Sequence, residues 1–161
     1  MRRPDKGCGG MNVARRAACD LAKPQRTQPY DSGMEAHHAI VAEPDRDLVR
    51  ITLSGFFDPS QVDRFNAARQ AAYRQLRCAP NAHLTLCDVS WMKIQTRDVV
   101  AAFTKVVADP RTRSRKLAFI IGSSLSRLQI QRTAERPGVA YFKDLATAEA
   151  WLFAEDEAVA A

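Results

Sequence analysis

The stretch HLTLCDVSWMKIQTRDVVAAFTKVVADPRTRSRKLAFIIG, residues 83–122, decides the fold because it contains two extended segments separated by a helical one. HLTLCDV (83–89) and KLAFIIG (116–122) are predicted strands, and the second lacks any polar–apolar alternation, as is typical of a strand covered on both faces. Between them, residues 96–110 have the apolar spacing of an amphipathic helix that Pro110 ends. This strand–helix–strand unit predicts parallel pairing.

The segment before this unit predicts a hairpin and a further helix. Residues 38–43 and 48–55 have the pattern of strands, and the four-residue turn between them makes them antiparallel neighbours. A helix begins with Asp58 as its N-cap, with Gln61 three residues later as the reciprocal cap, and runs to about Arg77.

The segment after the unit continues the alternation of strands and helices. We expect a third helix over about 124–135, a last strand at 139–142 and a closing helix at 144–153. The predicted fold class is α/β, with a single mixed, mostly parallel sheet in the order β-β-α-β-α-β-α-β-α. Periodicity leaves the spatial order of the strands and the distribution of the helices between the two faces open. One side of the closing helix is formed by Leu145, Ala148 and Leu152.

The composition is that of a single-domain globular protein. With 161 residues the chain is long enough for one core, and no apolar run approaches the ~20 residues that a membrane span needs. The four cysteines have no metal-ligand spacing, so we expect reduced thiols in a cytoplasmic protein. They are Cys8, Cys19, Cys78 and Cys87.

The net charge of +6 is concentrated at the N-terminus. Residues 1–33 hold seven of the 24 basic and three of the 18 acidic residues, which leaves the rest close to neutral. We expect residues 1–35 to form a disordered basic tail, 36–154 the domain and 155–161 a frayed end. Met34 directly precedes the first strand, so the tail could be absent if translation starts there. Nucleic-acid and membrane partners are not expected.

Three segments carry a resemblance to a known family. GFFDP (55–59), CDVS (87–90) and VAYFKDLATAEAWLF (139–153), together with the order of elements, resemble the SpoIIAA-like branch of the STAS fold. The resemblance covers residues 38–153. It implies a small, non-enzymatic α/β regulatory or interaction module whose partner is another protein.

The corner between the third strand and the next helix is the candidate switch that this resemblance implies. In the sigma-factor-antagonist branch the strand ends in D-L-S, and the helix begins with D-S-S-G, whose serine is phosphorylated. Asp88, Val89 and Ser90 match the first motif, whereas IQTRDVV (94–100) does not match the second. Thr96 is the nearest hydroxyl at a helix N-terminus, where phosphate is stabilised.

Two of these residues, Thr96 and Asp88, also have a structural interpretation. Thr96 could simply cap the helix, and Asp88 could accept hydrogen bonds from loop N–H groups. The candidates for partner binding or for a switch are Asp88, Ser90, Thr96 and Arg97.

The basic loop 110–116 has no interleaved aromatic residue for base stacking, and we interpret it as a solvated connector rather than a site for an anionic partner.

Two other classes of function make different predictions for this sequence. A carrier of a small apolar or lipid ligand is implied by the topology that SpoIIAA-like domains share with CRAL-TRIO domains, and it predicts a cavity beside Phe103, Val106 and Val107. An enzyme would need Asp88, Ser90 and His83 to converge, but His83 and Asp88 are an odd number of residues apart and face opposite sides of the sheet. We therefore expect no catalytic residue, no metal and no cofactor.

Overall fold

The computed structural model describes residues 35–122 and 124–155 and contains one five-stranded sheet. The strands are β1 (His37–Glu43), β2 (Leu48–Gly55), β3 (Leu84–Met92), β4 (Lys116–Ile120) and β5 (Val139–Phe142). They lie side by side in chain order, β1 antiparallel to β2 and every other pair parallel. The predicted mixed, mostly parallel sheet is confirmed. The predicted disordered tail and frayed end lie outside the described residues, except for their innermost positions.

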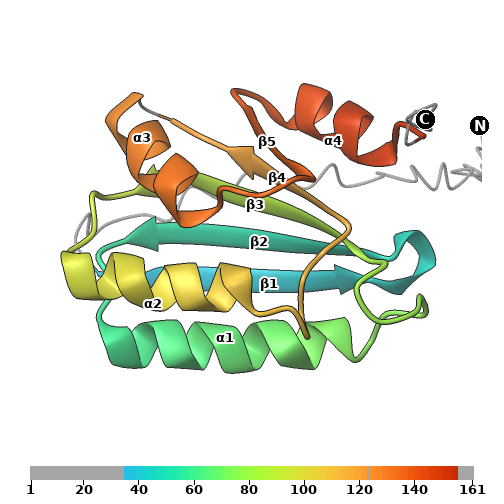
Figure 1. The fold of residues 1–161 in the computed structure, drawn as a ribbon, viewed down its shortest axis with the longest axis horizontal. Helices are drawn as coiled ribbons and strands as arrows, with labels where there is room; N and C mark the ends of the chain where they lie inside the picture. Colours follow the sequence, from blue (N-terminus) through green and yellow to red (C-terminus); the bar gives the residue numbers. More distant parts are fainter. Residues whose placement is uncertain (1–34, 123, 156–161) are drawn as a thin grey trace, which may run out of the picture. The chain divides into compact units, whose positions relative to one another are not determined.

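In the described part of the chain, four α-helices accompany the sheet (Figure 1): α1 (Pro59–Tyr73), α2 (Arg97–Ala108), α3 (Ser124–Thr133) and α4 (Leu145–Phe153). A short 3-10 turn, η1 (Pro44–Arg46), joins β1 to β2. Because the parallel strands follow one another in chain order, right-handed crossovers place α1, α2 and α3 on the same face. The last helix, α4, packs on the other face.

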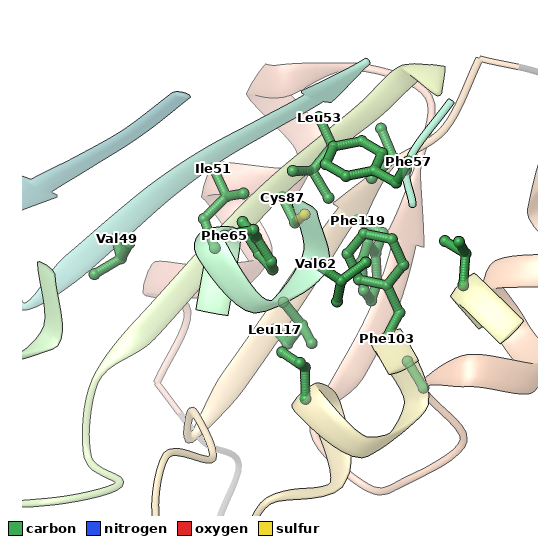
Figure 2. Packing of buried hydrophobic residues seen from close by; sticks show 14 of the residues in the cluster. Val49, Ile51, Leu53, Phe57, Val62, Phe65, Cys87, Phe103, Leu117 and Phe119 are labelled. Atoms are coloured by element: carbon green, nitrogen blue, oxygen red, sulfur yellow. The ribbon is translucent and has the colours of Figure 1, made fainter. Parts of the chain in front are cut away.

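Two hydrophobic clusters hold these layers together, one on each face of the sheet. In β3, Cys87 and Val89 face the three crossover helices, whereas Leu84 and Leu86 face α4. Figure 2 shows Phe65 of α1 and Phe103 of α2 in the larger cluster, with Phe119 and Leu117 of β4. All five residues of β4 are buried, as its unbroken apolar pattern predicts.

The start of α1 confirms the predicted cap. The carboxylate of Asp58 accepts a hydrogen bond from the Gln61 backbone N–H at 2.9 Å, and the Gln61 side chain accepts one from the Asp58 N–H at 2.8 Å. The helix ends at Tyr73 rather than near Arg77. Beyond it, the Asp47 carboxylate accepts hydrogen bonds from the N–H groups of residues 77 and 78, which hold the chain in a turn.

Two other details of the prediction are wrong. β3 continues to Met92, three residues past its predicted end, because residues 91 and 92 still pair with β2. Ser54 lies opposite Trp91 there, after a shift in the register of the two strands. In α4, Ala148 and Leu152 are fully buried, but Leu145 is 40% exposed. Leu145 lies in the first turn, next to the loop from β5, so it does not contribute to the packed side.

A buried histidine lies just before β3, on the face of α1. The ring of His83 is 5% exposed, and its centroid is 4.1 Å from that of Tyr73. Its Nε2 atom is buried without a hydrogen-bond partner. Burial, together with the positive charges of Arg69 and Arg136, lowers the pKa of His83 to about 4. His83 is therefore neutral at pH 7.

This histidine makes stability depend on pH. Its pKa in the folded protein lies below the unfolded value of about 6.5, so its contribution is complete above pH 6.5 and is lost as the pH falls toward 4. We expect His83→Phe, which keeps a ring against Tyr73, to make the free energy of unfolding depend less on pH between 6.5 and 4. Urea denaturation at several pH values measures this. An unchanged dependence on pH would contradict the assignment. The pKa of His38 is also lowered, so its contribution remains in the variant.

Candidate functional site

Gln95 organises the corner between β3 and α2, and it was missed in the sequence. Its side chain is 7% exposed and accepts a hydrogen bond from the Phe57 N–H at 2.8 Å. Its amide nitrogen donates to the carbonyls of Gly55 at 2.9 Å and Lys93 at 2.6 Å. Its backbone N–H and C=O both bond to the side chain of Gln129 in α3. One residue thus ties the corner to β2 and to α3.

Asp88 and Ser90 lie within β3 rather than in the loop. The carboxylate of Asp88 accepts a hydrogen bond from the Ser90 backbone N–H at 3.0 Å. The Ser90 side chain lines an open depression of about 560 Å³ at the carboxyl edge of the sheet, together with Arg127 and Lys143. A Cβ atom at Gly122 would lie 2.5 Å from the Ser90 carbonyl oxygen, so β3 and the end of β4 approach closely here.

Thr96 takes the N-cap position of α2, with an extended backbone, but its side chain makes no capping hydrogen bond. Thr96 is exposed, and so is the neighbouring Arg97. Two large apolar side chains precede them: Trp91 is 59% exposed and Ile94 is 53% exposed. We call residues 91–97 the β3–α2 corner. Its surface combines apolar and cationic side chains with one free hydroxyl-bearing residue.

The structure does not join the two halves of the predicted site. In the part of the chain that it describes, no hydrogen bond or ion pair connects Asp88 or Ser90 with Thr96 or Arg97. His83 contacts Tyr73 on the opposite side of the sheet from Asp88. Within residues 35–122 and 124–155, no three His, Cys, Asp or Glu side chains are grouped as metal ligands would be. Asp88 and Ser90 are thus joined within β3, and Thr96 and Arg97 are exposed separately where α2 begins.

The three predicted cavity residues share one cavity beneath α2. Phe103 and Val106 are buried and Val107 is half-buried, and all three line a volume of about 80 Å³ between α2 and the sheet. Most of the lining is apolar, but one end carries hydroxyl groups and arginines. Cys87 of β3 also lines this cavity, and burial raises the pKa of its free thiol.

The basic loop is partly engaged in the fold. The guanidinium of Arg111 binds both carboxylate oxygens of Asp109, at 3.1 and 3.0 Å. The ammonium of Lys116 donates to the carbonyl of Ala154 at 2.7 Å, just after α4. Among the described residues, no helix is both long enough and apolar enough to cross a membrane.

Comparison with solved structures identifies the type of fold. No protein-family profile matches the chain, and no curated protein does. Among solved structures, it is similar to an uncharacterised protein of the DUF3478 family with a SpoIIAA-like fold from Shewanella loihica. The TM-score is 0.60 at 17% identity, over 76% of this chain and 98% of the other.

A second solved structure is an anti-sigma factor antagonist from Mycobacterium paratuberculosis. Here the TM-score is 0.50 at 12% identity, over 72% of this chain and 94% of the other. At such identities the likeness concerns the fold alone. The chain has the SpoIIAA-like α/β fold of STAS domains, which confirms the resemblance seen in its sequence.

Proposed function

We propose that this protein is a non-enzymatic regulatory module that binds another protein through the β3–α2 corner. The observation that carries the proposal is the exposure of Trp91 and Ile94, each more than half accessible, beside the exposed Arg97. Tryptophan and arginine are the residue types most enriched among energetically dominant interface positions. We place this module in the cytoplasm, where Cys78 and Cys87 stay reduced.

The corner is rigid before any partner arrives. Gln95 holds the backbone of residues 93 and 95 through hydrogen bonds to β2 and to Gln129 of α3. A surface that is already ordered loses less conformational entropy on binding, so more of its contact energy appears as affinity. The buried Gln95 therefore supports the exposed Trp91 and Ile94 as an interface.

A second candidate function is the carriage of a small apolar or lipid ligand. The cavity beneath α2 favours it, because Phe103, Val106 and Val107 form an apolar wall there. Its volume of about 80 Å³ is roughly half that of an engineered cavity that holds benzene, so an occupant is small unless α2 moves.

The interface proposal is tested by affinity purification of the tagged protein from its own host, with quantitative mass spectrometry of what is bound. We expect the double variant Trp91→Ala, Ile94→Ala to lower recovery of a stoichiometric protein partner at least about tenfold, because it removes two central apolar contacts. Val41→Ala serves as the control, since Val41 is 56% exposed on β1, outside the corner. Equal recovery by both variants would refute the proposal.

Gln95→Ala tests the rigidity of the corner. The substitution leaves the buried Phe57 N–H without its acceptor and removes one of the two donors to the Gly55 carbonyl, so we expect the free energy of unfolding to fall by about 2 kcal/mol. Partner affinity should fall as well, although Gln95 itself is buried. Urea unfolding and the same purification measure both effects, and a loss of stability with full partner recovery would show that the corner does not need this support.

Thr96→Glu tests whether a phosphate at the corner switches binding. A negative charge at a helix N-terminus is favourable by about 0.3–1 kcal/mol, so the variant should fold normally. We expect it to lower partner recovery several-fold, because it places a charge in a partly apolar interface. Thr96→Ala, which cannot be phosphorylated, should retain full recovery. Full recovery with Thr96→Glu would exclude the switch and leave Thr96 as a helix-start residue.

A further inference from the structure

The cavity beneath α2 has an apolar wall and two groups of polar lining residues. Lys93, Gln95 and Gln129 lie by the β3–α2 corner, and Thr85 and Ser114 belong to the other group, which we call the polar end. The wall comes from α2, with Phe65 of α1 and Leu53 and Ile51 of β2. At the polar end, the hydroxyls of Thr85 and Ser114 lie 2.8 Å apart, and both residues are buried. Two arginines, Arg69 and Arg136, complete this end. An apolar pocket with a few polar groups at one end is typical of a site for a small amphipathic molecule.

Arg69 is the unusual member of this lining. It projects from α1, is only 6% exposed, and donates from Nη2 to Asn66 Oδ1 at 3.1 Å, to the Val106 carbonyl at 3.0 Å and to Thr112 Oγ1 at 2.9 Å. Its Nε is buried without a hydrogen-bond partner. Among the residues that the structure describes, no carboxylate lies within ion-pair distance of Arg69.

The positive charge of Arg69 stabilises the C-terminal end of α2. The Val106 carbonyl lies in the last turn of α2, the end of a helix that favours a cation. Those contacts occupy one nitrogen of a guanidinium that has five N–H donors. A buried guanidinium without an anionic partner is expensive. The ring of Tyr73, whose centroid lies 5.3 Å from Arg69 Cζ, offsets part of this cost, and an anion in the cavity would supply the acceptor that the buried Nε lacks.

The surroundings of Arg69 add positive charge and little that is negative. Arg136 donates to two backbone carbonyls, and its Nε is also buried without a partner. Burial lowers the pKa of Arg136, and so does the nearby charge of Arg113. The carboxylate of Asp109 feels the charge of Arg69, but both of its oxygens are already bound by Arg111.

We propose that this cavity binds a short-chain monocarboxylate, whose carboxylate accepts hydrogen bonds from Arg69 and whose alkyl chain lies against Phe103, Val106 and Val107. Arginine is suited to this role because its planar fork matches the two oxygens of a carboxylate. The volume of about 80 Å³ limits the alkyl part to about three or four carbons. The inference rests on the carrier candidate, to which it adds the charge and size of the ligand.

The test compares sodium butyrate with butyramide, its uncharged isostere, as probes of the full-length protein. Thermal unfolding and the arginine Nε–H resonances in NMR spectra report binding. We expect saturable binding of butyrate with a Kd of about 1 mM and binding of butyramide at least about tenfold weaker. Arg69→Met should weaken butyrate binding to the butyramide level, whereas Arg64→Met, an exposed position on the same helix, should leave it unchanged.

Each alternative result has a defined meaning. Equal affinity for butyrate and butyramide, or full butyrate affinity in folded Arg69→Met, would overturn the anion site and leave the apolar carrier. Binding of neither probe would overturn both. If Arg69→Met does not fold, Val107→Phe, which fills the cavity without touching a charge, must abolish butyrate binding for the proposal to stand. Partner binding through the β3–α2 corner is measured separately, so its outcome is independent of these results.

Discussion

The order of the strands is the constraint on which the rest of the structure depends. Because β2, β3, β4 and β5 are parallel and adjacent in chain order, every crossover runs in the same direction and the three connecting helices share one face. That face has the larger hydrophobic cluster. Among the described helices, α4 alone lies on the other face, where it covers β3 to β5 and leaves Val41 of β1 exposed. There Arg50 of β2 pairs with Glu43 and with Glu149, linking the hairpin to α4.

The same constraint brings both candidate surfaces to one helix. α2 begins at the β3–α2 corner, and its buried side forms the apolar wall of the cavity. Trp91 and Ile94 face outward before the helix, while Phe103 and Val106 face the sheet within it. The corner and the cavity are neighbouring parts of one region, since Met92, Lys93 and Gln95 of the corner also line the cavity.

Local patterns in the sequence predict the elements well, and long-range polar contacts explain what they miss. The hairpin, the Asp58 cap and the unbroken apolar strand β4 each depend on neighbouring residues, so periodicity reveals them. Gln95 cannot be identified in this way, because its partners at Gly55 and Gln129 are far away in the chain. The extension of β3 depends likewise on pairing with β2, which no pattern within β3 specifies.

Arg69 differs from these cases, since the sequence contains a signal for it. It falls at helical spacing between Phe65 and Ala72, both buried, and so stands on the apolar side of α1. A charged residue at such a position is either paired in the core or poised for a ligand. The apolar residues of α1 predict its buried face, and the arginine among them is the signal for a polar contact or a ligand inside the core.

The chain-order sheet also bears on how the protein reaches its native state. Each described strand pairs with the strand that precedes or follows it in sequence. The β1–β2 hairpin closes a short connection, whereas each parallel pair closes a longer crossover that contains a helix. Because the entropy of closing a crossover is lost before the parallel contacts form, the hairpin is the pairing that forms most readily, and the parallel strands are added more slowly.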